Sequence, residues 1–138
     1  MKGISVQEIK LSEDARGWVV WPMPESIIRG GRLSNVHIPL LKPEAIRGNH
    51  YHLHTVEYAL ILSGPCKAVF TDTATGETEQ MSFDGEKPVL LRIAPGITHA
   101  FQNEAPHDIL LLCYDEKLRD TEAPDTHRHV ILKDAASS

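Results

Sequence analysis

The chain has 138 residues, of which 41% are hydrophobic and 24% charged, as in ordinary folded globular proteins. Its 14 Lys and Arg against 19 Asp and Glu give a net charge of −5, which excludes a nucleic-acid module held by a basic stripe. No apolar run approaches the roughly 20 residues of a spanning helix, and the N-terminus lacks the apolar stretch of a signal peptide. We therefore expect a cytoplasmic protein, one domain over residues 1–138, that contacts neither nucleic acid nor membrane.

Short segments rich in Val, Ile, Leu and Thr alternate along the chain with turn residues, among them nine Gly and nine Pro. This pattern predicts the strands of an all-β sandwich or barrel rather than helices. The prolines between residues 22 and 43 favour edge strands and connections in the N-terminal third. In chain order, strands are predicted at 18–21, 32–38, 45–52, 57–63, 66–72, 77–82, 89–93, 99–103 and 108–114.

The two cysteines, Cys66 and Cys113, both lie inside apolar segments. A cytosolic thiol in such a segment usually behaves as a small buried hydrophobic group. We expect neither a disulfide nor a zinc site built from cysteines.

Histidine is unusually frequent, with eight in the chain and His50, His52 and His54 in one short run. In a strand, second neighbours project to the same side roughly 6.6 Å apart, and buried imidazoles are costly unless something binds them. Glu57 can return on the next strand, and His99 follows a sharp turn at Pro95-Gly96. Such a set of nitrogen and oxygen ligands suits zinc, iron, nickel or manganese. The alternative is a group of ordinary histidines bonded to backbone carbonyls.

Two spacings in the chain resemble the two motifs of the cupins. The first motif is His-x-His, three or four residues, Glu, six residues and Gly, and the second ends with Gly, two residues, His, three residues and Asn. Two further motif glycines are replaced here by Glu44 and Pro88, which affects turns rather than ligands. The matching positions are His50, His52, Glu57 and Gly64, then Gly96, His99 and Asn103.

The cupin resemblance implies a double-stranded β-helix, or jelly-roll barrel, with its core at about 33–116 and a C-terminal extension at 117–138. It also implies one divalent transition metal, held by His50, His52, Glu57 and His99.

A closer resemblance, over about residues 33–131, is to the C-terminal cupin domain of bifunctional capsular-polysaccharide enzymes. It rests on Gly48-Asn49-His50-Tyr51-His52, Pro95-Gly96-Ile97-Thr98-His99 and Pro124-Asp125-Thr126. That domain binds zinc and epimerises C3 of a UDP-4-keto-6-deoxy-N-acetylhexosamine. Arg47-Gly48-Asn49-His50 also resembles the Arg-Gly-x-His of dTDP-4-keto-6-deoxyhexose 3,5-epimerases. The resemblance implies a zinc-dependent epimerase or isomerase of a nucleotide sugar in surface polysaccharide biosynthesis.

Epimerisation next to a ketone requires a base for the C–H proton and stabilisation of the enolate. His54, left over from the ligand set, is the expected base. Tyr51, Tyr58 and Tyr114 are possible acids that the sequence does not rank; we assign Tyr114 to catalysis, and Tyr51 and Asn103 to substrate binding. Arg47 is expected to bind the diphosphate through its planar guanidinium. The remaining histidines, expected to be solvated or locally bonded, are His37, His107, His127 and His129.

Two other function classes remain open from the sequence. The same ligand set can hold Fe(II) and support a dioxygenase, and the barrel can be a non-catalytic sugar or metabolite binder, since fold does not fix function. We also expect a homodimer, because small barrels commonly cover an exposed edge strand by pairing.

Overall fold

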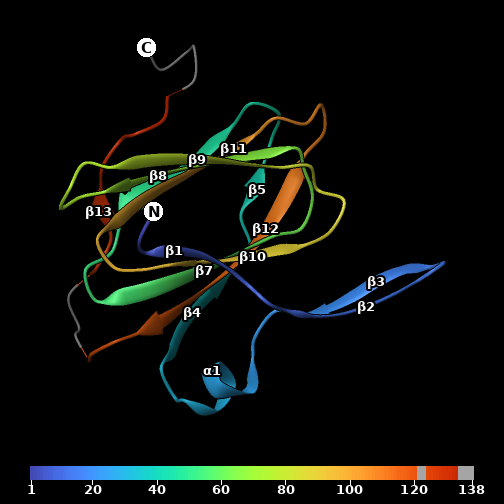
Figure 1. Cartoon of the computed structure of the whole chain (residues 1–138), viewed down its shortest axis with the longest axis horizontal. Helices are drawn as coiled ribbons and strands as arrows, with labels where there is room; N and C mark the ends of the chain where they lie inside the picture. Colours follow the sequence, from blue (N-terminus) through green and yellow to red (C-terminus); the bar gives the residue numbers. More distant parts are fainter. Residues whose placement is uncertain (121–123, 134–138) are drawn as a thin grey trace.

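In the computed structural model, which describes residues 1–120 and 124–133, two antiparallel sheets enclose an apolar core (Figure 1). The larger sheet has the strand order β1-β10-β7-β12-β4, and β5 also pairs with β12. Its strands are β1 (Ile4–Gln7), β4 (Leu33–His37), β5 (Leu40–Leu41), β7 (Thr55–Ile61), β10 (Val89–Ile93) and β12 (Ile109–Lys117).

The smaller sheet has the order β13-β6-β11-β8-β9. The turn at 73–76 joins β8 to β9, where Asp72 caps the backbone N–H of Ala74. This sheet consists of β6 (Ile46–Tyr51), β8 (Cys66–Asp72), β9 (Thr78–Phe83), β11 (Ile97–Asn103) and β13 (His127–Arg128).

The remaining elements lie outside the two sheets. The hairpin of β2 (Lys10–Asp14) and β3 (Gly17–Trp21) projects to one side of the barrel, and α1 (Glu25–Arg29) lies near β4 (Figure 1). The sequence pattern did not predict α1, because five residues are too few to show a helical period. It also missed the edge strand β1, the hairpin strand β2 and the two-residue strands β5 and β13.

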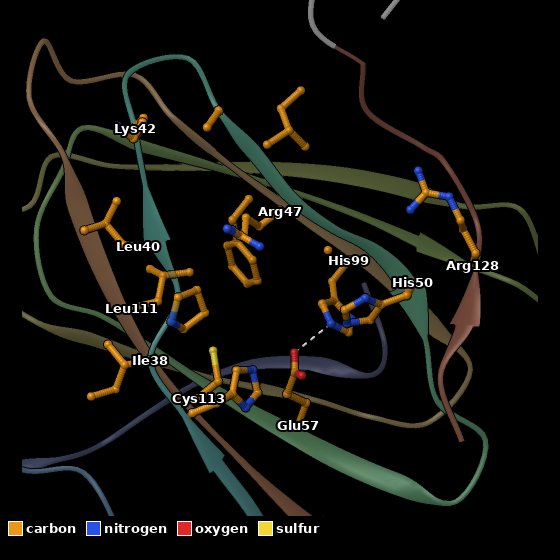
Figure 2. Close-up of a pocket in the computed structure, with 16 residues that line it drawn as sticks. Ile38, Leu40, Lys42, Arg47, His50, Glu57, His99, Leu111, Cys113 and Arg128 are labelled. Carbon is orange, nitrogen blue, oxygen red and sulfur yellow. Dashed lines mark ion pairs between the residues drawn. The ribbon is translucent and has the colours of Figure 1, made fainter. Parts of the chain in front are cut away.

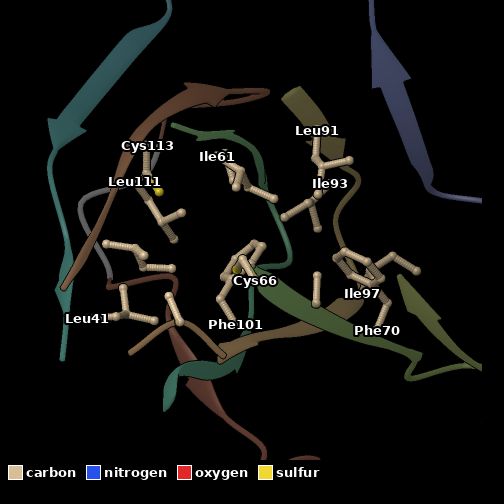
Figure 3. Packing of buried hydrophobic residues seen from close by; sticks show 14 residues of the cluster. Leu41, Ile61, Cys66, Phe70, Leu91, Ile93, Ile97, Phe101, Leu111 and Cys113 are labelled. Carbon is tan, nitrogen blue, oxygen red and sulfur yellow. The ribbon is translucent and has the colours of Figure 1, made fainter. Parts of the chain in front are cut away.

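Alternation along the strands divides the buried residues between two clusters. On β7, Ala59 and Ile61 point into the barrel, where they pack with Phe70 and Phe101 of the smaller sheet (Figure 3). Tyr58 and Leu60 belong to a second cluster on the outer face, together with Tyr114 and Ile27. Residues of one strand that differ by a single position can thus face quite different surroundings.

The structure confirms the all-β fold and all the strands predicted from the sequence, with ends that shift by up to three residues. Cys66 and Cys113 are buried and free, as expected, and burial raises the pKa of both thiols. In the described part of the chain, no helix has the length and apolar character needed to cross a bilayer.

The described part of the C-terminal extension packs on its own barrel. The Asn49 side-chain oxygen accepts hydrogen bonds from the backbone N–H groups of Ile131 and Leu132, at 2.9 and 3.0 Å. Its amide nitrogen donates to the Leu132 carbonyl at 3.0 Å. The apolar residues at 130–132 therefore help to cover β6. Residues 121–123 and 134–138 of the predicted extension lie outside the described residues.

Candidate metal centre and substrate cavity

The structure brings together the side chains that the sequence predicts as metal ligands. One ligand atom from each of four residues lies within 4.8 Å of the others, and the residues are His50, His52, Glu57 and His99. His50 is on β6 and His99 on β11, in the smaller sheet, whereas Glu57 is on β7, in the larger one. The group therefore joins the two sheets across one end of the barrel interior.

A bulge between β6 and β11 aims His50 at this group. The Cα partners are His50 with His99 and Gly48 with Ala100, so Asn49 is an extra residue on β6. Gly48 has a φ of 104°, and a Cβ there would lie 2.6 Å from the His99 carbonyl oxygen. Bulges of this kind redirect a side chain at the cost of one unpaired residue. Glycine is required at 48 by both its backbone conformation and this close approach.

The buried nitrogens of the group have no protein partner in hydrogen-bond geometry. Among the described residues, Nε2 of His52 and Nε2 of His99 are buried without a hydrogen bond. Nε2 of His52 nevertheless lies 3.6 Å from one Glu57 carboxylate oxygen, and Nε2 of His99 lies 2.6 Å from the other, the contact dashed in Figure 2. Buried polar atoms are normally satisfied. Orphaned nitrogens that converge on a carboxylate, in a set of three imidazoles and one carboxylate, fit a transition metal ion.

The pKa values of the group also fit a bound cation. Burial lowers the pKa of His50 to about 4, which keeps that imidazole neutral. Burial raises the pKa of Glu57, but the adjacent imidazoles of His99 and His52 outweigh it and hold the pKa well below its usual value. Burial also lowers the pKa of His52, but Glu57 and the Asp125 carbonyl outweigh it and raise the pKa to about 9. The buried carboxylate thus favours a positive charge beside it, as a proton or a metal ion.

Backbone carbonyls orient two of the imidazoles. Nδ1 of His52 donates to the Asp125 carbonyl at 2.6 Å, and Nδ1 of His99 donates to the Ile97 carbonyl at 3.3 Å. A donor at Nδ1 leaves the lone pair of a neutral imidazole on Nε2. Both rings therefore present Nε2 to the centre of the group, which is how outer partners usually hold metal-ligating histidines.

A cavity of about 830 Å³ opens beside this group (Figure 2). Ile38, Leu40 and Leu111 lie on one side in the close-up, and His50, His99 and Arg128 on the other. The cationic lining residues are Lys42, Arg47 and Arg128. A cavity with an apolar wall, a few convergent polar groups and a cationic rim suits a small anionic ligand with an uncharged body.

Arg47 is the one predicted substrate-binding residue that lines the cavity. Tyr51 instead stacks on His127, with ring centroids 5.1 Å apart, and is not part of the lining. Asn103 is fully buried: its amide donates to the carbonyls of Leu41 and His107, and its oxygen accepts from the Ala105 N–H. Asn103 thus holds the chain together rather than facing a ligand.

Neither predicted catalytic residue faces the cavity. Nε2 of His54 lies 2.9 Å from a guanidinium nitrogen of Arg119, in the turn after β6 where strand alternation has ended. Tyr114 projects to the outer face of β12, where it stacks on Tyr58 and donates a 2.6 Å hydrogen bond to the Pro22 carbonyl. Tyr58, the other candidate acid, lies in the same outer cluster. His54 and Tyr114 thus lie outside the cavity lining, and their catalytic roles stay predictions.

Among the histidine, lysine and arginine residues of the cavity lining, the sequence did not indicate three, namely His37, Lys42 and Arg128. His37 was expected to be solvated or locally bonded. No local pattern marks it, because its side of the sheet follows from pairing with Cys113, a residue of the barrel core. Arg128 lies opposite His50 through the pairing of β13 with β6, a contact that no local pattern indicates.

Residues 12–127 match the family described as the polysaccharide biosynthesis C-terminal domain. The chain belongs to this family. Over 85 residues it is 31% identical to a UDP-2-acetamido-2,6-beta-L-arabino-hexul-4-ose reductase of Pseudomonas aeruginosa, an alignment that covers 62% of this chain and 23% of the relative.

Solved structures of sugar-modifying proteins share the fold. The capsular polysaccharide assembling protein CapF of Staphylococcus aureus matches with a TM-score of 0.64 and 23% identity, over 90% of this chain and 35% of that one. A dTDP sugar isomerase of Desulfovibrio desulfuricans matches with a TM-score of 0.76 and 15% identity, over 98% and 87%. The 3,4-ketoisomerase QdtA of Thermoanaerobacterium thermosaccharolyticum gives 0.73 and 17%, over 94% and 89%. The chain thus spans about a quarter of the curated relative and a third of CapF.

Proposed function

We propose that this chain is a metal-dependent epimerase or isomerase of a nucleotide-linked 4-keto-6-deoxy sugar, in the biosynthesis of a surface polysaccharide. The observation that carries the proposal is the buried group of three histidines and Glu57 beside a cavity with a cationic rim. The family and the relatives support the substrate class: one relative is a UDP-sugar reductase, and QdtA was solved with TDP-4-keto-6-deoxyglucose.

The four residues that would hold the ion are His50, His52, Glu57 and His99, and zinc is the metal we favour. When bound, a divalent metal acts as a Lewis acid that lowers the energy of negative charge developing on a carbonyl oxygen. The protein contributes the rigid frame. The carbonyls of Asp125 and Ile97 orient the rings of His52 and His99, and burial of Glu57 excludes water from the carboxylate.

The cationic rim and the apolar wall of the cavity would contact different parts of a nucleotide sugar. Arg47, Lys42 and Arg128 would bind the diphosphate, because guanidinium and ammonium groups pair with phosphate oxygens. The apolar side chains Ile38, Leu40 and Leu111 would pack against uncharged parts of the ligand. Binding in this orientation would bring the sugar next to the histidine group, with the nucleotide toward the rim.

Metal content and proton exchange test the proposal together. Wild type, His52→Ala and the control His107→Ala are purified without added metal and without a histidine tag; His107 is exposed and lies outside the cavity lining. Plasma mass spectrometry is expected to find about one zinc per chain in wild type and control, and none in His52→Ala. In D2O, wild type and control should introduce deuterium at C3 of a UDP-4-keto-6-deoxy-N-acetylhexosamine, and His52→Ala should not.

Three results would redirect the assignment. Bound iron together with oxygen uptake would favour the dioxygenase. A metal-loaded protein that binds the nucleotide sugar without proton exchange would favour a non-catalytic binder. No metal in wild type would overturn the ligand assignment.

A further inference from the structure

His37 lines the cavity but has no role in the function proposed above. It is the last residue of β4, and its ring lines the same cavity as Arg47, His50 and Glu57. In the register of the larger sheet, His37 lies beside Cys113, and Cys113 beside Ala59. Directly opposed residues of an antiparallel pair share a face, so His37 projects to the barrel side of the sheet.

The same register places His37 across β12 from Glu57 of the metal-ligand group. The next row of paired residues on this face, two positions along each strand, consists of Asn35, Asp115 and Glu57. Strands β4 and β7 are separated by β12, so their backbones lie roughly 10 Å apart. That separation leaves room for a sugar ring between the His37 imidazole and the Glu57 end of the cavity.

Asn35 and Asp115 set the orientation of the His37 ring. The side-chain nitrogen of Asn35 lies 3.1 Å from Nδ1 of His37 and 3.4 Å from a carboxylate oxygen of Asp115, which is buried. An amide nitrogen can only donate, so Nδ1 of His37 accepts and the proton of the neutral ring is on Nε2. Among the described residues, His37 Nε2 has no hydrogen-bond partner.

We propose that His37 contacts the substrate, with Nε2–H donating a hydrogen bond to an uncharged oxygen of the sugar, a carbonyl or hydroxyl next to the reacting carbon. The inference rests on the proposed function for the substrate class. A neutral donor discriminates among sugar oxygens, whereas the cations of the rim recognise phosphate. Asn35 is a positioning residue that selects the Nε2–H tautomer, and Asp115 holds the Asn35 amide in place.

The binding test compares UDP with a UDP-4-keto-6-deoxy-N-acetylhexosamine by calorimetry, for wild type, His37→Phe, His37→Gln and the control His107→Phe. His37→Phe keeps a ring but loses the donor, so affinity for the nucleotide sugar should fall about tenfold, the effect of one neutral hydrogen bond. Affinity for UDP and the metal content should stay unchanged. His37→Gln retains an N–H and should recover most of the loss, and the control should match wild type.

The tautomer is tested without ligand. Nitrogen-15 NMR of labelled wild type should show Nε2 of His37 protonated and Nδ1 not, and Asn35→Asp, which replaces the donor with an acceptor, should reverse this. A wild-type ring protonated at Nδ1 overturns the inference, as does a His37→Phe variant that binds the sugar like wild type or loses its metal. If wild type binds the sugar through His37 but exchanges no proton, the epimerase proposal fails and the contact stands. If wild type does not bind the sugar at all, both fail.

Discussion

Asp125 shows how one side chain can organise a remote turn. Its carboxylate accepts hydrogen bonds from the backbone N–H groups of Leu53 and His54, each at 2.8 Å, and from the Thr55 hydroxyl at 3.0 Å. Its carbonyl accepts from His52. A single residue thus holds the turn between β6 and β7, which contains the proposed ligand His52 and leads to the proposed ligand Glu57 on β7.

Asp125→Asn tests the contribution of this carboxylate to stability. The amide cannot accept from all three donors, so we expect a loss of about 1–2 kcal/mol in the free energy of unfolding at pH 7, measured by urea denaturation. Burial raises the pKa of Asp125, but the bonds from Leu53 and His54 outweigh it and leave the pKa below its ordinary value. The wild-type advantage should therefore be present above the unfolded pKa near 4 and disappear as the pH falls through the lower folded value. A difference that stays constant down to pH 2 would contradict this.

Tyr114→Phe tests whether Tyr114 is structural. The variant keeps the stacking on Tyr58 but removes the donor to the Pro22 carbonyl. We expect a loss of about 1 kcal/mol in the free energy of unfolding and an unchanged rate of deuterium incorporation. A large loss of exchange with unchanged stability would return Tyr114 to the mechanism.

At the scale of elements, the bulge of β6 connects backbone geometry to the site. Gly48 and Asn49 both have positive φ values, and the extra residue lies directly before His50. Asn49 also holds the backbone of residues 131–132. The bulge therefore sets the direction of a proposed ligand on one side and docks the C-terminal segment on the other.

Gly48→Ala should damage both stability and metal binding. The added methyl group would lie 2.6 Å from the His99 carbonyl oxygen, so β6 and β11 must separate where they carry His50 and His99. The matched control is Gly76→Ala, in the turn after β8, where φ is also positive but no atom lies within 4 Å of the added Cβ. Both variants bear the backbone strain of about 1–3 kcal/mol, but Gly48→Ala should lose more stability and bind less than one metal per chain. Equal losses in urea denaturation would show that the close approach is harmless.

At the scale of the molecule, the proposed ligands link the two sheets. His50 and His99 come from the smaller sheet and Glu57 from the larger one. A metal that binds only the folded chain stabilises it by about 2.7 kcal/mol when the free ion is at 100 times its dissociation constant. We expect a chelator such as dipicolinate to lower the melting temperature of wild type by about 5–10 °C and to leave that of His52→Ala unchanged. Equal shifts for both proteins would mean that the chelator acts elsewhere.

The homodimer stays a prediction that light scattering can test.

The sequence predicts site residues well where they follow a local spacing, and poorly where their position depends on the pairing register of distant strands. The positions of the main strands and the set His50, His52, Glu57 and His99 follow from short patterns, because each spacing is read within one or two strands, whereas strand ends shift by up to three residues. A motif does not tell on which face of β12 Tyr114 lies, so its catalytic role stays a prediction. Arg128 reaches the cavity through pairing with a strand nearly 80 positions earlier, which no local pattern encodes.

The contact between His52 and Asp125 also has a consequence for the order of events on the ribosome. All four proposed ligands are synthesised before residue 125. A nascent chain can therefore pair β6 with β11 while His52 is still free to place its proton on either ring nitrogen. Only when Asp125 arrives does its carbonyl select the arrangement that leaves Nε2 open. A growing chain should thus hold its ion weakly at first and firmly once residue 125 has been synthesised and contacts His52.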